Sequence, residues 1–180
     1  YGSAIYKINL LNRTAAVFVD DSSLPSGNQL IEPRGVAVDG EGNVYFSSWY
    51  NDPTQLYDAT GRVYYSNPAG EIQGNNVLGN PSIFYYDPTG VYDPPAGNSA
   101  ITGAGVILSG YGIQDIFWAP EKTVPSSSKR LLDNAPWRTY LDVEVINGRL
   151  YYTDTVFGIL WRRTGDEARV VELSGLVSPT

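Results

Sequence analysis

The chain has 180 residues, a net charge of −7 and no Cys, His or Met. This length is enough for one domain with a sizeable core, and an acidic chain with scattered Lys and Arg argues against a nucleic-acid partner. The absent His and Cys exclude Ser-His and Cys-His nucleophile systems and thiolate zinc sites. No apolar run approaches the roughly 20 residues of a membrane-spanning helix.

The missing Cys and Met, the oxidisable side chains, suit an oxidising exterior. We therefore expect an extracellular or cell-surface protein, and because the first residue is not Met we expect it to be a processed or truncated end. The segment Asn12-Arg13-Thr14 is a sequon with a permitted middle residue and predicts glycosylation of Asn12. Chance occurrence is the alternative for such a short motif.

In chain order, residues 3–20 predict a strand, a polar turn and a second strand. Residues 32–72 begin in the same way, with the strand GVAVD, the turn GEGN and the strand VYFSSW. Residues 82–120 open with SIFYYDPTG, which looks like the first half of the 3–20 unit. Residues 142–175 read as four short strands, and Asn147-Gly148 between the first two is the strongest hairpin signal.

These units repeat one pattern. Val44–Phe46 aligns with Leu150–Tyr152, and Ile5-Tyr6 aligns with Leu160-Trp161. Repeated four-stranded antiparallel units indicate an all-β fold of β-propeller type. We expect a single domain over residues 1–180 with about three and a half to four blades, in which residues 51–141 fit the pattern loosely.

The stretch PRGVAVDGEGNVYFSS resembles the NHL repeat. The stretch NGRLYYTDTVFGILWRRTGDEARVVELSG is similar to a blade of the gluconolactonase (senescence marker protein) and strictosidine-synthase-like propellers. The resemblance covers residues 3–20, 32–50 and 142–175. It implies a propeller superfamily whose members usually have about six blades, so the chain forms a closed small propeller, a fragment, or an arc completed by another chain.

The resemblance also implies a candidate metal site. The lactonases of this superfamily hold one divalent ion at the central axis with Glu, Asn and Asp oxygens, a ligand set that suits calcium or another hard cation. The residues that match this ligand set by type and by position at the start of a strand are Asp115 and Asp142, and Asn51, Glu32 and Asn43 are possible further ligands. The competing interpretation, which we favour, is that an Asp at a strand end forms a turn with its own backbone.

Two further patterns remain. The loop DGEGN, residues 39–43, lacks the spacing of an EF-hand and is interpreted as a tight turn. Tyrosine doublets such as Tyr64-Tyr65 place one ring on each face of a strand, so one ring packs and the other packs or forms a contact surface. We take Trp49, Tyr50 and Trp137, which lie next to loops, as candidate aromatics of a carbohydrate- or protein-binding surface.

The patterns together favour a secreted, non-catalytic β-propeller module without a cofactor. Its expected partner is another protein, further copies of itself, or a carbohydrate. The alternative is a divalent-metal-dependent lactonase or related hydrolase, which rests on the resemblance. In that case the metal polarises the lactone carbonyl and activates water, and an Asp acts as the general base.

Overall fold

The computed structural model describes residues 3–49, 60–78, 80–88, 104–111, 117–120, 122–123, 129–130, 140–146, 149–154, 159–164 and 167–174. These residues form fourteen β-strands and one short 3-10 turn, η1 (Asp21–Ser23). The prediction of an all-β protein is confirmed.

The strands form four antiparallel sheets within the described residues. β1 (Ile5–Asn9) and β2 (Thr14–Val19) form a two-stranded sheet. The first four-stranded sheet contains β3 (Val36–Val38), β4 (Val44–Ser48), β5 (Thr60–Ser66) and β6 (Ile72–Leu78). The second contains β7 (Asn80–Asp87), β8 (Gly105–Tyr111), β9 (Phe117–Pro120) and β10 (Lys129–Arg130). The third contains β11 (Tyr140–Ile146), β12 (Arg149–Asp154), β13 (Ile159–Thr164) and β14 (Glu167–Ser174).

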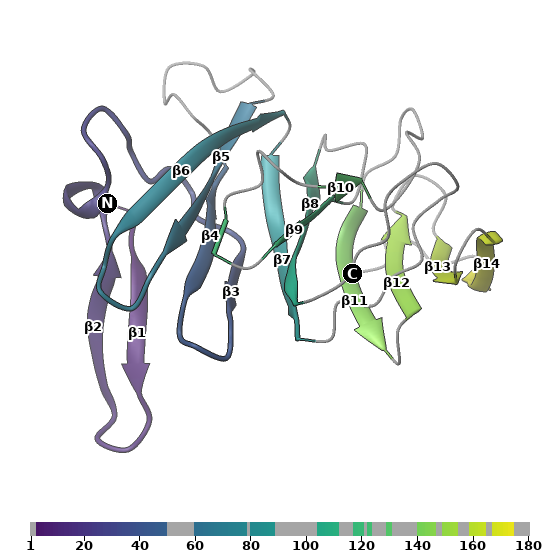
Figure 1. The fold of residues 1–180 in the computed structure, drawn as a ribbon, viewed down its shortest axis with the longest axis horizontal. Coiled ribbons are helices and arrows are strands. Elements are labelled where there is room, and N and C mark those ends of the chain that lie inside the picture. The colour runs from purple at the N-terminus through teal and green to yellow at the C-terminus, as the bar shows by residue number, and fades with distance from the viewer. Residues whose placement is uncertain are drawn as a thin grey trace.

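In every sheet, strands that follow one another along the chain are hydrogen-bonded neighbours. The sheets also follow one another in space, since β7 contacts β3, β4 and β5, and β11 contacts β7 and β8. Figure 1 shows the β1–β2 sheet at one end of the long axis and β13 and β14 at the other. The described strands therefore form a row of stacked sheets whose first and last members lie apart.

The alternation of side chains along β4 and β5 explains why the sheets stack. Phe46 and Tyr64 share one face, with ring centroids 5.0 Å apart and nearly parallel planes. Tyr45 and Tyr65 share the other face, with centroids 5.5 Å apart. The Tyr64-Tyr65 doublet thus places one ring on each face, as predicted, and both rings are buried. Each face of this sheet must be covered by a neighbour, because each carries aromatic side chains.

The two faces have different neighbours. Phe46 and Tyr64 pack with Val19 of β2 and with Leu24 and Leu30 of the segment that leads to β3. On the opposite face, the neighbour is the second sheet: Tyr45 and Tyr65 pack with Val106 of β8 and with Tyr86 of β7. The β3–β6 sheet therefore lies between the N-terminal hairpin and the β7–β10 sheet.

Side-chain hydrogen bonds fix the segment between β2 and β3. Asp20 caps η1, where its Oδ1 accepts a hydrogen bond from the Ser22 amide at 3.0 Å. The next residue, Asp21, accepts the Leu30 amide at 2.7 Å. The Ile31 amide donates to Ser48 Oγ at 2.8 Å. These bonds hold the segment so that Leu24 and Leu30 reach the core.

Candidate functional site

The loop DGEGN folds as a turn built on Asp39. Asp39 Oδ1 accepts the amides of Glu41 at 3.0 Å and Asn43 at 2.9 Å. Gly42, whose φ is 86°, allows the chain to reverse at a left-handed conformation that favours glycine. The tight turn predicted for residues 39–43 is confirmed, and the structure adds that the Asp39 side chain forms it with the hydrogen bonds of an Asx-turn.

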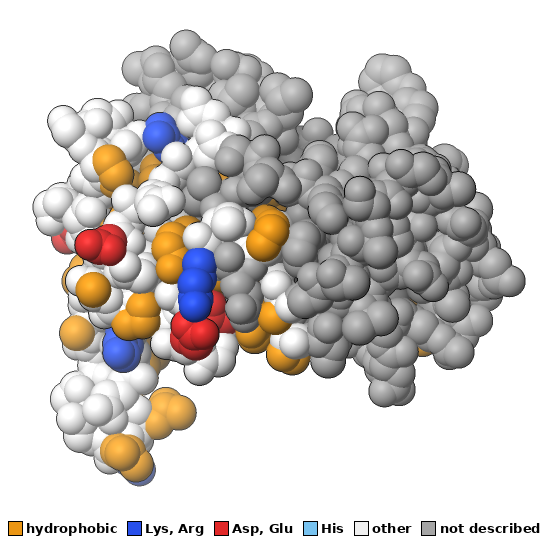
Figure 2. Space-filling model, in the orientation of Figure 1, with side chains coloured by type: hydrophobic (Ala, Val, Ile, Leu, Met, Phe, Trp, Pro, Cys, Tyr) orange, Lys and Arg blue, Asp and Glu red, His pale blue; other side chains and the backbone are white. Residues whose placement is uncertain are grey.

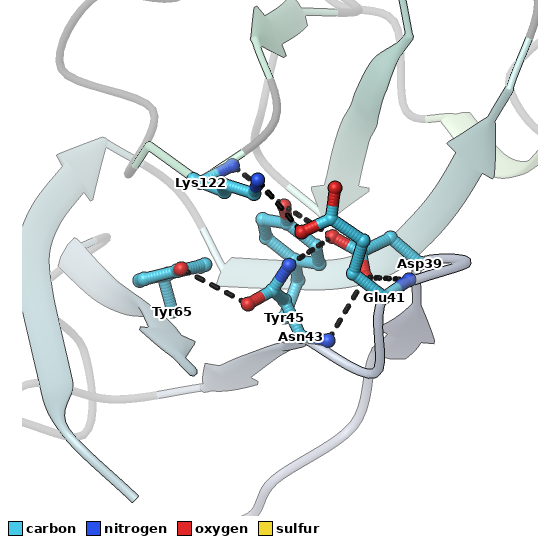
Figure 3. Close-up of polar contacts among 6 residues, drawn as sticks. All are labelled: Asp39, Glu41, Asn43, Tyr45, Tyr65 and Lys122. Carbon is cyan, nitrogen blue, oxygen red and sulfur yellow. Dashed lines mark hydrogen bonds and ion pairs between the residues drawn. The ribbon is translucent and has the colours of Figure 1, made fainter. Parts of the chain in front are cut away.

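The same carboxylate is the centre of a buried polar network, which Figure 3 shows. Asp39 Oδ2 accepts hydrogen bonds from Asn43 Nδ2 at 2.7 Å and from the Tyr45 hydroxyl at 3.2 Å. Asn43 Oδ1 in turn accepts the Tyr65 hydroxyl at 3.1 Å. Both Asp39 and Asn43 are buried, so these partners replace the water that each group loses on folding.

The network reaches from the first four-stranded sheet to the second. The Tyr45 hydroxyl accepts the amide of Lys122 at 2.8 Å. Lys122 follows β9 closely, and its Nζ pairs with the Glu41 carboxylate at 2.7 Å. Because the Lys122 and Glu41 side chains are half exposed, their ion pair is weak. Within the described residues, the buried hydroxyl of Tyr45 therefore forms a polar link between the two sheets.

Electrostatics agree with a structural role for this network. Burial raises the pKa of Asp39, but hydrogen bonds from Asn43, Glu41 and Tyr45 together outweigh burial and lower that pKa below the ordinary value. Burial also raises the pKa of Tyr45. The carboxylate therefore stays ionised and the phenol stays neutral, which is the arrangement that the hydrogen bonds require. The polar atoms are engaged with one another, and the cluster joins two sheets.

The residues predicted to bind a metal are placed as follows. Glu32 is exposed, and its Oε2 pairs with the Arg34 guanidinium at 3.0 Å. Asn43 belongs to the Asp39 network. Asp142 lies on β11, where the structure describes the backbone alone, and Asp115 and Asn51 lie outside the described residues. Within the described ranges, no three acidic residues gather as a metal site would require, and the metal site stays a prediction.

Of the three candidate surface aromatics, the structure describes Trp49. Its ring is half-buried, and the Arg34 guanidinium carbon lies 3.6 Å from the ring centroid. A cation therefore occupies one face of the indole. Tyr50 and Trp137 lie outside the described residues, so a sugar or protein contact by these aromatics stays a prediction.

The candidate glycosylation site lies in the turn between β1 and β2. Asn12 is exposed, and its Oδ1 accepts hydrogen bonds from the Thr14 hydroxyl at 2.7 Å and the Thr14 amide at 3.2 Å. Arg13 between them has a φ of 57°. This position is open to a modifying enzyme, and glycosylation itself stays a prediction.

Sequence reasoning missed a surface at the N-terminal end. Side-chain exposure is described mainly for residues 3–49 and 61–76. Among these residues, the exposed large hydrophobic side chains lie within residues 6–38, and together we call them the N-terminal apolar surface: Tyr6, Ile8, Leu10, Leu11, Val17, Val36 and Val38. The two leucines at the hairpin tip are 85% and 98% exposed. Figure 2 shows the tip projecting from the body with hydrophobic side chains at its end. The signal in the sequence is IYKINLL, which is more apolar than a hairpin with one buried face needs.

Strand register divides this surface into two parts. On the hairpin, Tyr6 lies opposite Val17, so the two share one face. On β3, Val36 lies opposite Phe46, and Val38 lies opposite Val44. The two valines therefore face the side of the sheet on which the hairpin packs, yet they are 54% and 55% exposed. The hairpin covers Phe46 and leaves β3 uncovered.

Structural comparison assigns the class of fold, which is that of a β-propeller. The chain is similar to a chain in the crystal structure of a nidogen/laminin complex, with a TM-score of 0.57 and 17% sequence identity. The match covers 96% of this chain and 55% of that chain, so the protein spans about half the length of the chain it resembles. No protein-family model matches the sequence, and no curated protein matches it. In the described residues, no helix is long and apolar enough to cross a membrane.

Proposed function

We propose that this chain is a secreted, non-catalytic β-propeller module that binds another protein through its N-terminal apolar surface. The observation that carries this proposal is the gathering of seven exposed large hydrophobic side chains within residues 6–38, two of them at the hairpin tip. Large apolar side chains that gather on one part of a protein surface mark an interaction site, because their exposure to water is unfavourable. Tyrosine and leucine side chains that project from the body supply the apolar area that such a contact buries.

Two further observations support the proposal. The structure that the chain resembles is that of a complex between proteins, and this favours a binding role in an extracellular setting. In the Asp39 network, the carboxylate accepts the Asn43 amide and the Tyr45 hydroxyl, and Asn43 accepts the Tyr65 hydroxyl. These bonds favour a structural role for the network. The NHL and gluconolactonase-like branch remains the finer assignment that the sequence resemblance favours.

Site-specific photo-crosslinking tests the binding role. A photoreactive residue is placed at Ile8, and a matched control carries it at Gln73, an exposed position on β6. We expect the first protein to give a discrete adduct in the extracellular fraction of its source, and the second to give none. Leu10→Ser with Leu11→Ser in the crosslinking protein should reduce the adduct. Equal adducts from positions 8 and 73, or none from either, would contradict the proposal.

A hydrolase assay tests the non-catalytic part. The full chain is incubated with a panel of lactones and Ca²⁺, Mg²⁺, Mn²⁺ or Zn²⁺, with and without a chelator. We expect no hydrolysis above the rate with buffer alone. Metal-dependent turnover that Asp142→Asn abolishes would instead establish the lactonase.

A further inference from the structure

We propose that the partner is a second copy of this chain: the tip of the β1–β2 hairpin of each copy docks on Val36 and Val38 of the other, and the two contacts form a closed dimer. This inference rests on the proposed function, because it names the partner that the N-terminal apolar surface binds. A two-fold symmetric interface needs two surfaces on one chain that complement each other. The described residues contain such a pair.

The first surface is the hairpin tip, residues 9–14. Its two leucines, Leu10 and Leu11, are 85% and 98% exposed. The Asn9 side chain accepts hydrogen bonds from the amides of Leu11 at 2.9 Å and Asn12 at 3.3 Å. These bonds fix the backbone that presents the leucines, so little conformational freedom is lost when the leucines are buried in a contact.

The second surface is the exposed side of β3, which we call the β3 face. Val36 and Val38 are 54% and 55% exposed, while Ala37 between them is buried on the other side of the sheet. Val38 lies opposite Val44, and Val44 packs against the core that the hairpin covers. The β3 face is therefore continuous with the core, and leucine side chains placed on it would extend that core.

The tip does not cover the β3 face of its own chain. Val36 and Val38 are exposed with the hairpin in place, and Figure 2 shows the tip projecting from the body. Figure 1 shows the tip and the loop between β3 and β4 directed toward the same side of the molecule. Two copies related by a two-fold axis on that side would bring each tip to the β3 face of the other copy.

The tip carries positive charge. Residues 3–19 contain Lys7 and Arg13 and no carboxylate. The next carboxylate along the chain is Asp20, six residues after Thr14 along the extended strand β2. That separation is about 20 Å, well beyond the screening length of about 8 Å at physiological ionic strength. No carboxylate of the hairpin therefore offsets the charge at its tip.

The edge of the sheet next to the β3 face is acidic. It carries three carboxylates and one cation, a net charge of −2: Asp39, Glu41, Glu71 and Lys122. Burial raises the pKa of the Tyr65 hydroxyl, Lys122 opposes this rise and the three carboxylates add to it, so all four charges lie near one group. The hairpin carries +2 and this edge −2, and opposite charges therefore meet in both contacts of the dimer.

These features favour a second copy over other occupants. An anionic membrane would attract the tip but would repel the acidic edge, which lies on the same side of the molecule. A different protein would have to supply both an apolar patch and carboxylates beside it. The chain itself has this combination next to β3, so a second copy covers the leucines and the valines at once.

Disulfide trapping tests the arrangement, because the chain has no Cys. The full protein is produced in a bacterial host, so that Asn12 at the tip carries no glycan. Under mild oxidation, Leu11→Cys with Val38→Cys should give a covalent dimer linked between positions 11 and 38, since a disulfide needs Cα atoms within about 7 Å. Pro25→Cys with Val38→Cys, which uses an exposed residue away from the tip, is the matched control and should give several-fold less dimer.

Sedimentation equilibrium of the protein without added cysteines measures the affinity. We expect the mass to rise with concentration from one chain to two and no further. Leu10→Ser with Leu11→Ser should raise the dimer Kd about a hundredfold, because apolar contact is lost at both sites. Lys7→Gln with Arg13→Asn should raise it several-fold and reduce its salt dependence, and Asn tolerates the φ of 57° at position 13. Pro25→Ser should leave it unchanged.

Several results would overturn the inference. Equal trapping of the two cysteine pairs, or a disulfide that joins position 11 to position 38 within one chain, would contradict the arrangement. A mass that keeps growing with concentration would contradict the closed dimer. Flotation with phosphatidylcholine–phosphatidylserine vesicles that the leucine variant abolishes would identify a membrane as the occupant. A monomer at every concentration, combined with an adduct from position 8 to a different protein, would reject the second copy and leave the proposed function standing, whereas loss of both would reject both.

Discussion

The buried carboxylate of Asp39 stabilises both a turn and a contact between two sheets. It closes the turn between β3 and β4 through two backbone amides, and it accepts the Tyr45 hydroxyl that links the first four-stranded sheet to Lys122. The turn could be predicted from DGEGN alone, because Asx-turns are local. The contact with Lys122 could not, because the two residues are distant in the sequence and meet only when the sheets stack.

Asp39→Ala should lower the free energy of unfolding by about 2 kcal/mol, because it leaves buried donors without an acceptor. Urea denaturation of both proteins gives this difference. Glu71→Ala, which removes an exposed carboxylate in the connection between β5 and β6, is the control and should change stability by less than about 0.5 kcal/mol. Equal stability of Asp39→Ala and the parent protein would show that the network adds nothing.

The lowered pKa of Asp39 predicts the pH dependence of stability. A carboxylate whose folded pKa lies below its unfolded value contributes its stability above the unfolded pKa, here near 3.8, and loses that contribution as the pH falls through the folded pKa. The free energy of unfolding should therefore decrease between about pH 5 and pH 2. Asp20, whose pKa its hydrogen bond with Ser22 lowers most, adds to the slope. Asp39→Asn should make the slope shallower, and an unchanged slope would show that this group is not responsible.

A substitution at Gly74 on β6 gives a further prediction about stability. A Cβ at this position would lie 2.7 Å from two carbons of the Tyr64 ring, which the stacked ring of Phe46 holds in place. Gly74→Ala should destabilise the protein by about 1–3 kcal/mol, measured by thermal or urea unfolding. Gly40→Ala, where a Cβ would have no neighbour within 4 Å, is the matched control and should be nearly neutral.

At the scale of elements, the sheets depend on both faces of β4 and β5 being covered. The pattern VYF on β4 and VYY on β5 predicts aromatic side chains on both faces. It does not say what covers each face. The N-terminal hairpin covers one and the β7–β10 sheet covers the other, and this arrangement follows from the order in which the sheets stack.

Tyr45→Phe tests the polar link between the sheets. The variant keeps the ring and removes the acceptor of the Lys122 amide, so it should cost about 1 kcal/mol and speed the exchange of that amide with deuterium. Tyr65→Phe is the control, because it removes the hydrogen bond to Asn43 and leaves the Lys122 amide bonded. Equal exchange rates at Lys122 in both variants would mean that the Tyr45 hydroxyl does not join the sheets.

At the scale of the molecule, the described strands form a row of stacked propeller-type sheets. In the first four-stranded sheet, one face of β3 is exposed at Val36 and Val38. The chain spans about half the length of the propeller chain it resembles. Among the side chains whose exposure is described, the exposed large apolar ones lie on the two-stranded sheet and on β3. We therefore expect the proposed association to take place through that end and to need no metal ion.

The thermal midpoint and native mass of the full protein should therefore be the same with and without a chelator. A bound divalent ion would raise stability in proportion to the logarithm of its concentration. Differential scanning calorimetry and light scattering at several Ca²⁺ concentrations measure both quantities. A midpoint that falls on chelation and is restored by Ca²⁺ would contradict this prediction and support Asp115 and Asp142 as metal ligands.

The all-β class, the strands of the repeat units and the turn at residues 39–43 could be predicted from the sequence, because side-chain alternation, Asx-turns and glycine turns act between residues close in the chain. Asp39–Asn43 and the Tyr64-Tyr65 doublet were predicted on this basis. Residues 51–141 fitted the repeat pattern only loosely. Only the tertiary structure decided that Tyr45 bonds Lys122, that Arg34 covers Trp49, and that Val36 and Val38 have no cover. The Tyr45–Lys122 bond and the exposure of the two valines depend on which sheet lies against which, and stacking is set by contacts between distant segments that no local pattern records. The Arg34–Trp49 contact depends on the pairing of the segments that flank β3 and β4.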